Sequence, residues 1–177
     1  MSDQKILEKI LSLGATHAAI MNRDGIVVNR MFREICEKNA CGMFNRCWVC
    51  PPDVGDIDDL MGRLAPYRRA VLFQTISDLE DSFDIEGMQA AGERHAQLCL
   101  RVKREVGFPG PYLVLGGGGC HLCETCAKRE NLPCRRPDDA TPGMETYGID
   151  VYNTACHAGL KYVNGQNTVT YFGIALY

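Results

Sequence analysis

The chain has 177 residues, of which 46% are hydrophobic and 23% charged, and its formal net charge is -3. This length is enough to bury a core in one domain, and the small negative charge offers no basic surface for nucleic acid. No apolar run approaches the roughly 20 residues of a membrane span and the charged start is unlike a secretory signal, so we expect a cytoplasmic protein without nucleic-acid or membrane partners.

The N-terminal part of the chain alternates between helix and strand patterns. Apolar residues recur at helical spacing over residues 3–13, and Gly14 ends that pattern. The segments that follow predict, in chain order, a strand over 16–21, a turn over 22–25, a strand over 26–28 and short helices over 32–37 and 56–64.

The C-terminal part continues the alternation with longer elements. It predicts a buried strand over 70–76, a long helix over 85–106, a strand over 112–115, a helix over 150–160 and a closing strand over 169–176. We therefore expect an α/β or α+β fold, in which helices pack on a mixed sheet of about four or five strands. Residues 1–177 form one domain in this interpretation, with cysteine-rich loops at about 36–52 and 116–137.

The second of these loops carries the clearest chemical signal. Cys120, Cys123 and Cys126 follow one another at two-residue gaps, as in the ligand run of bacterial ferredoxins, and Cys134 lies further on. One tight turn can direct three such thiolates at an iron–sulfur cluster. Zinc is the alternative, although structural zinc prefers pairs of cysteines separated by a longer gap.

The first loop carries four more cysteines in a less regular pattern: Cys36, Cys41, Cys47 and Cys50. Pro51 follows the last of them, as a proline does in ferredoxins. In a reducing compartment, two sets of four cysteines are more typical of metal ligands than of disulfides. We therefore predict a second metal centre here.

Residues near the two groups have simpler interpretations. Cys99 lies on the core face of a helix, and Cys156 is interpreted as a buried structural thiol, with a missing ligand or a redox thiol as alternatives. The glycine run 116–119 predicts either a flexible linker or a backbone nest for anionic sulfur. Glu145 follows the second loop and is a candidate supporting group or proton carrier there.

Together these motifs resemble the DUF2284 family of predicted metal-binding proteins. The resemblance rests on Cys36, Cys41-Gly and Trp48-Val-Cys50-Pro-Pro, then on Gly-Gly-Cys120-x2-Cys123-x2-Cys126 with Pro133-Cys134-Arg-x-Pro137, and on Met144-Glu145-x2-Gly148-Ile149-Asp150-Val151. It implies an iron–sulfur or otherwise cysteine-ligated metal protein, mostly from anaerobic bacteria and archaea, and no settled reaction. Many relatives have a non-cysteine residue at the position of Cys47, which implies three shared ligands and one variable ligand in the first group.

These observations predict two [4Fe-4S] clusters, with ligands Cys36, Cys41, Cys47, Cys50, Cys120, Cys123, Cys126 and Cys134. The expected role is electron transfer or redox chemistry with a redox partner protein in an anaerobic cytoplasm. Two alternatives stay open: a zinc-stabilised interaction module, and a redox or metal-transfer enzyme in which one cluster has an open site. No catalytic residue is predicted.

Overall fold

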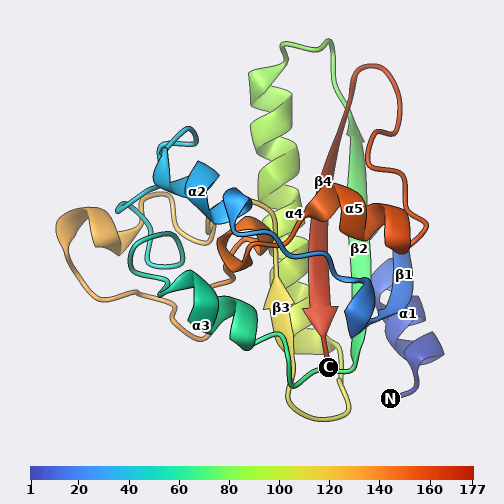
Figure 1. Ribbon diagram of the computed structural model, residues 1–177. Coiled ribbons are helices and arrows are strands. Elements are labelled where there is room, and N and C mark those ends of the chain that lie inside the picture. Colours follow the sequence, from blue (N-terminus) through green and yellow to red (C-terminus); the bar gives the residue numbers. More distant parts are fainter.

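The computed structural model describes residues 1–177 and consists of five α-helices and four β-strands (Figure 1). They follow in the order α1 (Asp3–Ser12), β1 (His17–Asn22), α2 (Met31–Glu37), α3 (Ile57–Gly62), β2 (Arg69–Asp78), α4 (Ile85–Glu105), β3 (Leu113–Leu115), α5 (Val151–His157) and β4 (Thr168–Leu176). Three short 3₁₀ helices complete the chain: η1 (Arg23–Gly25), η2 (Ala127–Glu130) and η3 (Met144–Tyr147). None of the helices is both long enough and apolar enough to cross a membrane.

One predicted strand is wrong. Residues 26–28 do not join the sheet, and Val28 makes only a single bridge to Ile149. The apolar residues of this segment contribute to the core instead, because Ile26 is buried in a cluster of hydrophobic side chains that packs against the sheet.

The four strands form one sheet in the order β1-β2-β4-β3, which confirms the layered fold with helices on a sheet. All three pairings are antiparallel, so the expectation of a mixed sheet is corrected. The chain does contain two parallel strands, β2 and β3, which α4 connects. The last strand, β4, inserts between them and pairs with both, which leaves no parallel neighbours in the sheet.

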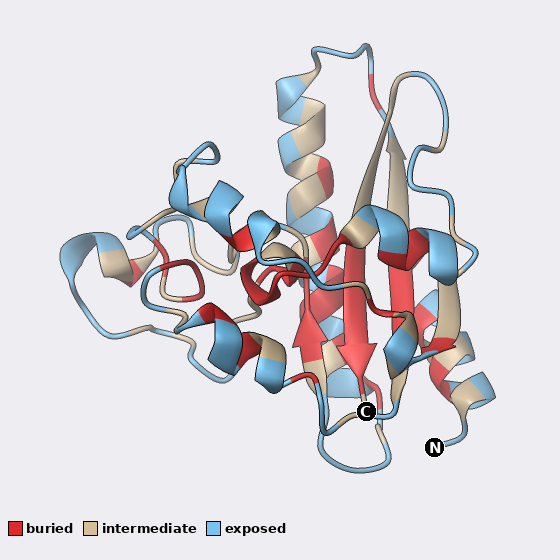
Figure 2. Ribbon diagram, viewed as in Figure 1, coloured by how far each residue is buried: buried red, intermediate tan, exposed pale blue.

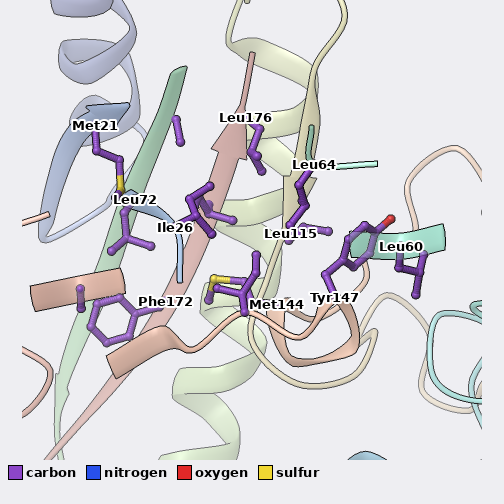
Figure 3. Close-up of a cluster of buried hydrophobic side chains, with 14 residues drawn as sticks. Met21, Ile26, Leu60, Leu64, Leu72, Leu115, Met144, Tyr147, Phe172 and Leu176 are labelled. Carbon is purple, nitrogen blue, oxygen red and sulfur yellow. The ribbon is translucent and has the colours of Figure 1, made fainter. Parts of the chain in front are cut away.

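Both faces of the sheet are covered by apolar side chains. Val71 and Phe73 of β2 face a cluster formed with α1 and α4, whereas Leu72 faces a second cluster formed with α3, η3 and α5. Figure 2 shows the buried residues concentrated on the strands, and Figure 3 shows the second cluster. A strand covered on both faces has no reason to alternate with polar residues, which explains the continuous apolar run of β2.

The two cysteine-rich segments, residues 36–55 and 116–142, lie side by side at one edge of the molecule, beyond β3 (Figure 1). We call them together the cysteine lobe. The indole Nε1 of Trp48 donates to the carbonyl of Leu132 at 2.9 Å, and Lys128 pairs with Asp53 at 2.6 Å. Polar contacts therefore join the two segments, which are distant in the sequence.

Candidate metal centre

The second cysteine group is brought together as its spacing predicts. Cys120, Cys123, Cys126 and Cys134 all line one small cavity of about 20 Å³. Between the third and fourth cysteine the chain makes the short helix η2, and Asn131 ends it in a left-handed conformation (φ 56°). This turn sends the chain back, so that Cys134 reaches the cavity that the first three cysteines line.

Two arginines close the same loop. Arg135 Nη1 donates to the carbonyl of Thr125 at 2.9 Å, and Arg136 Nη1 donates to the carbonyl of Leu122 at 3.2 Å. Both side chains also line the cavity. The two guanidinium groups therefore hold the loop of the second cysteine group in place, and they place positive charge beside its four thiols.

The first cysteine group is only partly assembled. Cys36, Cys41 and Cys50 line a larger cavity of about 260 Å³, but Cys47 does not. The rest of the wall is mostly apolar and includes Phe32, Ile35, Met43 and Phe44. Three thiols rather than four therefore face this cavity.

Cys47 lies between the two groups. Its side chain is 1% exposed and belongs to a small buried cluster with Cys50, against which Cys120 and Cys126 pack. Hydrogen bonds from the Cys50 thiol, from backbone N–H groups and from the Cys126 thiol lower the pKa of Cys47. The hydrogen bond with Cys47, together with burial, raises the pKa of Cys50. Cys47 is thus part of the wall that separates the two cavities.

Glu145 lines the first cavity, a position that the sequence alone did not indicate. It lies in η3, lines the first cavity beside Cys36, Cys41 and Cys50, and also lies next to Gly118 of the second loop, whose N–H is 3.5 Å from its Oε2. Burial raises the pKa of its carboxyl group. Burial first, and then the charge of Glu145, raise the pKa of Cys36. Only the folded chain reveals this proximity, since the two residues are 109 positions apart in the sequence.

The glycine run 116–119 is not a free linker, because backbone contacts hold it to the neighbouring segment, while the nest for anionic sulfur stays a prediction. Gly116 donates to the carbonyl of Pro142 at 2.9 Å and accepts from the N–H of Met144 at 2.8 Å. The N–H of Gly118 points at Oε2 of Glu145, 3.5 Å away. A Cβ on Gly119 would lie 3.2 Å from Cε of Met43, so glycine allows the two segments of the lobe to approach closely.

The two remaining cysteines are core and surface residues. Cys99 is 1% exposed in α4, as predicted, and burial raises its pKa to about 12. Cys156 is exposed, which corrects its interpretation as a buried thiol. The short helix α5 buries Thr154 and Ala155 and turns its next residue to solvent.

The donor chemistry of both cavities fits a thiolate-bound metal. Thiolates select zinc, copper(I) and iron–sulfur clusters. No three His, Cys, Asp or Glu side chains converge closely enough to hold a single metal ion. The side chains that line both cavities thus supply soft donors without forming a site for a single ion.

Comparison with known proteins agrees with this chemistry. Residues 19–177 match the DUF2284 family, described as "Predicted metal-binding protein (DUF2284)". No curated protein and no solved structure matches the chain. Because the match covers most of its length, the chain belongs to this family of predicted metal-binding proteins, which supports a metal cofactor in general.

Proposed function

We propose that this member of the DUF2284 family is an iron–sulfur protein with two [4Fe-4S] clusters, one at each cysteine-lined cavity, and that it works in electron transfer. Such clusters accept and release single electrons at potentials that the protein sets. A redox partner protein would deliver or remove those electrons. The cavity lined by all four cysteines of the second group is the observation that supports the proposal most strongly.

The shared wall between the cavities supports transfer between two centres. Cys50 faces the first cavity, Cys120 and Cys126 face the second, and all three pack around the buried Cys47. Centres held by these residues would therefore be neighbours. Two neighbouring redox centres in one small protein are suited to passing electrons in sequence.

The charges around the second cavity also suit a cluster. Arg135 and Arg136 line the cavity, and a cluster with four thiolates carries negative charge. Nearby positive charge and hydrogen bonding tune metal centres and, for iron–sulfur clusters, raise the reduction potential. We therefore expect the second cluster to have the higher potential, since no arginine or lysine lines the first cavity.

A second candidate function follows from the first cavity. It presents three thiols, a carboxylate and an apolar wall, and it is more than twice as large as the other cavity. A cluster with only three cysteine ligands has one iron free for another donor. This supports a redox or metal-transfer enzyme in which the second cluster delivers electrons and the first binds a substrate.

Metal and sulfide analysis of anaerobically purified protein tests the proposal. Two clusters predict about eight irons and eight sulfides per chain and a brown absorbance that bleaches with dithionite. One or two zinc ions without colour or sulfide would contradict it and leave the zinc-stabilised interaction module. Iron without sulfide would also contradict it.

A further inference from the structure

We propose that Glu145 is the fourth protein ligand of the first centre, together with Cys36, Cys41 and Cys50, and that Cys47 is not a ligand there. This inference deepens the proposed function and rests on it. It assigns one iron of the first cluster a carboxylate instead of a thiolate, and it makes that iron the one that binds external molecules.

The membership of the cavity is the first support. Cys36 comes from the last turn of α2, Cys41 and Cys50 from the turns that follow, and Glu145 from η3. Of the acidic and cysteine side chains, these four alone line it. The first cavity thus has four potential anionic donors, and Glu145 is 95 to 109 positions away from the three cysteines in the sequence.

The electrostatics of Glu145 is the second support. No ion pair in the structure includes this carboxylate, and its only hydrogen bond to another residue is the long one from Gly118. The nearby Arg33 is engaged elsewhere, with Glu37 at 3.4 Å and the carbonyl of Gly55 at 2.8 Å. A partly buried carboxylate without a cation is costly. A bound metal would supply the missing positive charge.

The position of Cys47 is the third support. Its thiol is enclosed by Cys50, Val49 and the two second-group cysteines Cys120 and Cys126, and it is absent from the lining of the first cavity. To reach a centre there it would have to leave a site in which it is 1% exposed. Its enclosed position suits a spacer between two centres better than a ligand of the first.

A carboxylate ligand has a chemical consequence. Carboxylate oxygen is a harder donor than thiolate and holds a soft thiolate-bound iron less firmly. An external ligand can therefore displace the Glu145 carboxylate from the iron, while the three cysteines keep the cluster bound. Phe32, Ile35 and Phe44 form much of the surrounding wall, so we expect a small, mostly apolar molecule with one oxygen, nitrogen or sulfur donor atom.

Four variants of the full chain, purified without oxygen, test the assignment: Glu145→Gln, Glu145→Cys, Cys47→Ser and Cys50→Ser. Iron and sulfide per chain are measured, together with the electron paramagnetic resonance of the dithionite-reduced protein before and after addition of cyanide. We expect Cys47→Ser to keep the iron of the natural protein and Cys50→Ser to lose about half of it. Cyanide should change the signal of the natural protein but not that of Glu145→Cys, because a fourth thiolate closes the exchangeable position.

Glu145→Gln replaces the carboxylate with a neutral amide of the same shape. It should shift the resonance of one cluster only and lower the iron content on repeated gel filtration. The inference is overturned if Cys47→Ser loses as much iron as Cys50→Ser while both Glu145 variants behave like the natural protein. Circular dichroism separates these outcomes from unfolding. If the natural protein itself holds no iron and sulfide, the proposed function fails instead.

Discussion

The sheet and the cysteine lobe are stabilised in different ways. The sheet lies between two clusters of buried apolar residues, one of 14 and one of 12 members, whereas the lobe has a cluster of only three: Cys47, Val49 and Cys50. Figure 2 shows the lobe largely exposed or half-buried, next to a sheet that is almost entirely buried at its centre. Burial of apolar surface stabilises the sheet, and it cannot do so for the lobe.

The lobe therefore depends on a few polar contacts and on its thiols. Long segments without regular structure are uncommon in a compact domain unless something orders them. Metal binding contributes directly to the folding of small metal sites. We therefore expect a bound metal to stabilise the lobe, whereas the sheet should fold without it.

The substitution Cys123→Ser should have the largest effect on the lobe. We expect about half of the iron to be lost, because this cysteine lines only the second cavity. The far-UV circular dichroism should be the same as that of the natural protein, because the sheet remains folded. Limited proteolysis should cut residues 116–142 faster than in the natural protein. Cys156→Ser is the matched control, since this exposed thiol lies outside both groups. Unchanged iron in Cys123→Ser would contradict the model of two clusters.

Acid should destabilise the sheet through the protonation of His95. This side chain is 1% exposed and stacks between the rings of Phe73 and Tyr171, and burial lowers its pKa to about 4. The folded protein therefore resists protonation that the unfolded chain accepts below pH 6.5, so stability falls as the pH drops from 6.5 towards 4. The loss amounts to about 3 kcal/mol over that range.

Denaturant unfolding of His95→Gln at several pH values measures this contribution. The variant should lose less stability between pH 6.5 and pH 5 than the natural protein does. Metal content measured at each pH separates the effect of the histidine from any loss of metal in acid. Parallel curves for the two proteins would show that another group is responsible.

Overpacking of the sheet should have a smaller effect. A Cβ on Gly173 would lie 2.5 Å from Cζ of Phe73 and 3.0 Å from Sγ of Cys99. Gly173→Ala should therefore cost about 2 kcal/mol and leave the iron content unchanged. Gly62→Ala in α3 is the control, because a Cβ there meets no atom within 4 Å and alanine favours helix. A loss of iron in Gly173→Ala would contradict the independence of the two regions.

The smallest effect is expected from the ion pair that joins the two segments of the lobe. Lys128 Nζ lies 2.6 Å from Asp53 and 4.5 Å from the centre of the Trp48 ring. Because this pair is half-buried, Asp53→Asn should cost about 1 kcal/mol in thermal unfolding of the metal-bound protein. The control Asp58→Asn breaks an exposed pair with Arg30 of the same length and should cost less. Equal effects of the two variants would argue against a role of this contact in joining the segments.

Local pattern was sufficient to predict every α-helix, all four strands and the grouping of Cys120, Cys123, Cys126 and Cys134, because helical spacing, apolar runs and cysteine spacing act over a few residues. The second cysteine group is of this kind, since one loop carries all four of its cysteines. The strand predicted at 26–28 failed because a short apolar segment can pack into a core without pairing.

The long-range arrangement required the folded chain. The insertion of β4 between β2 and β3 decided the antiparallel sheet, and no local pattern specifies which strands pair. The same holds at the first group, where folding placed Glu145 beside Cys36 and enclosed Cys47 in the wall between the cavities. Which side chains share a cavity depends on contacts between distant segments, and hydrophobic burial of the whole domain selects those contacts.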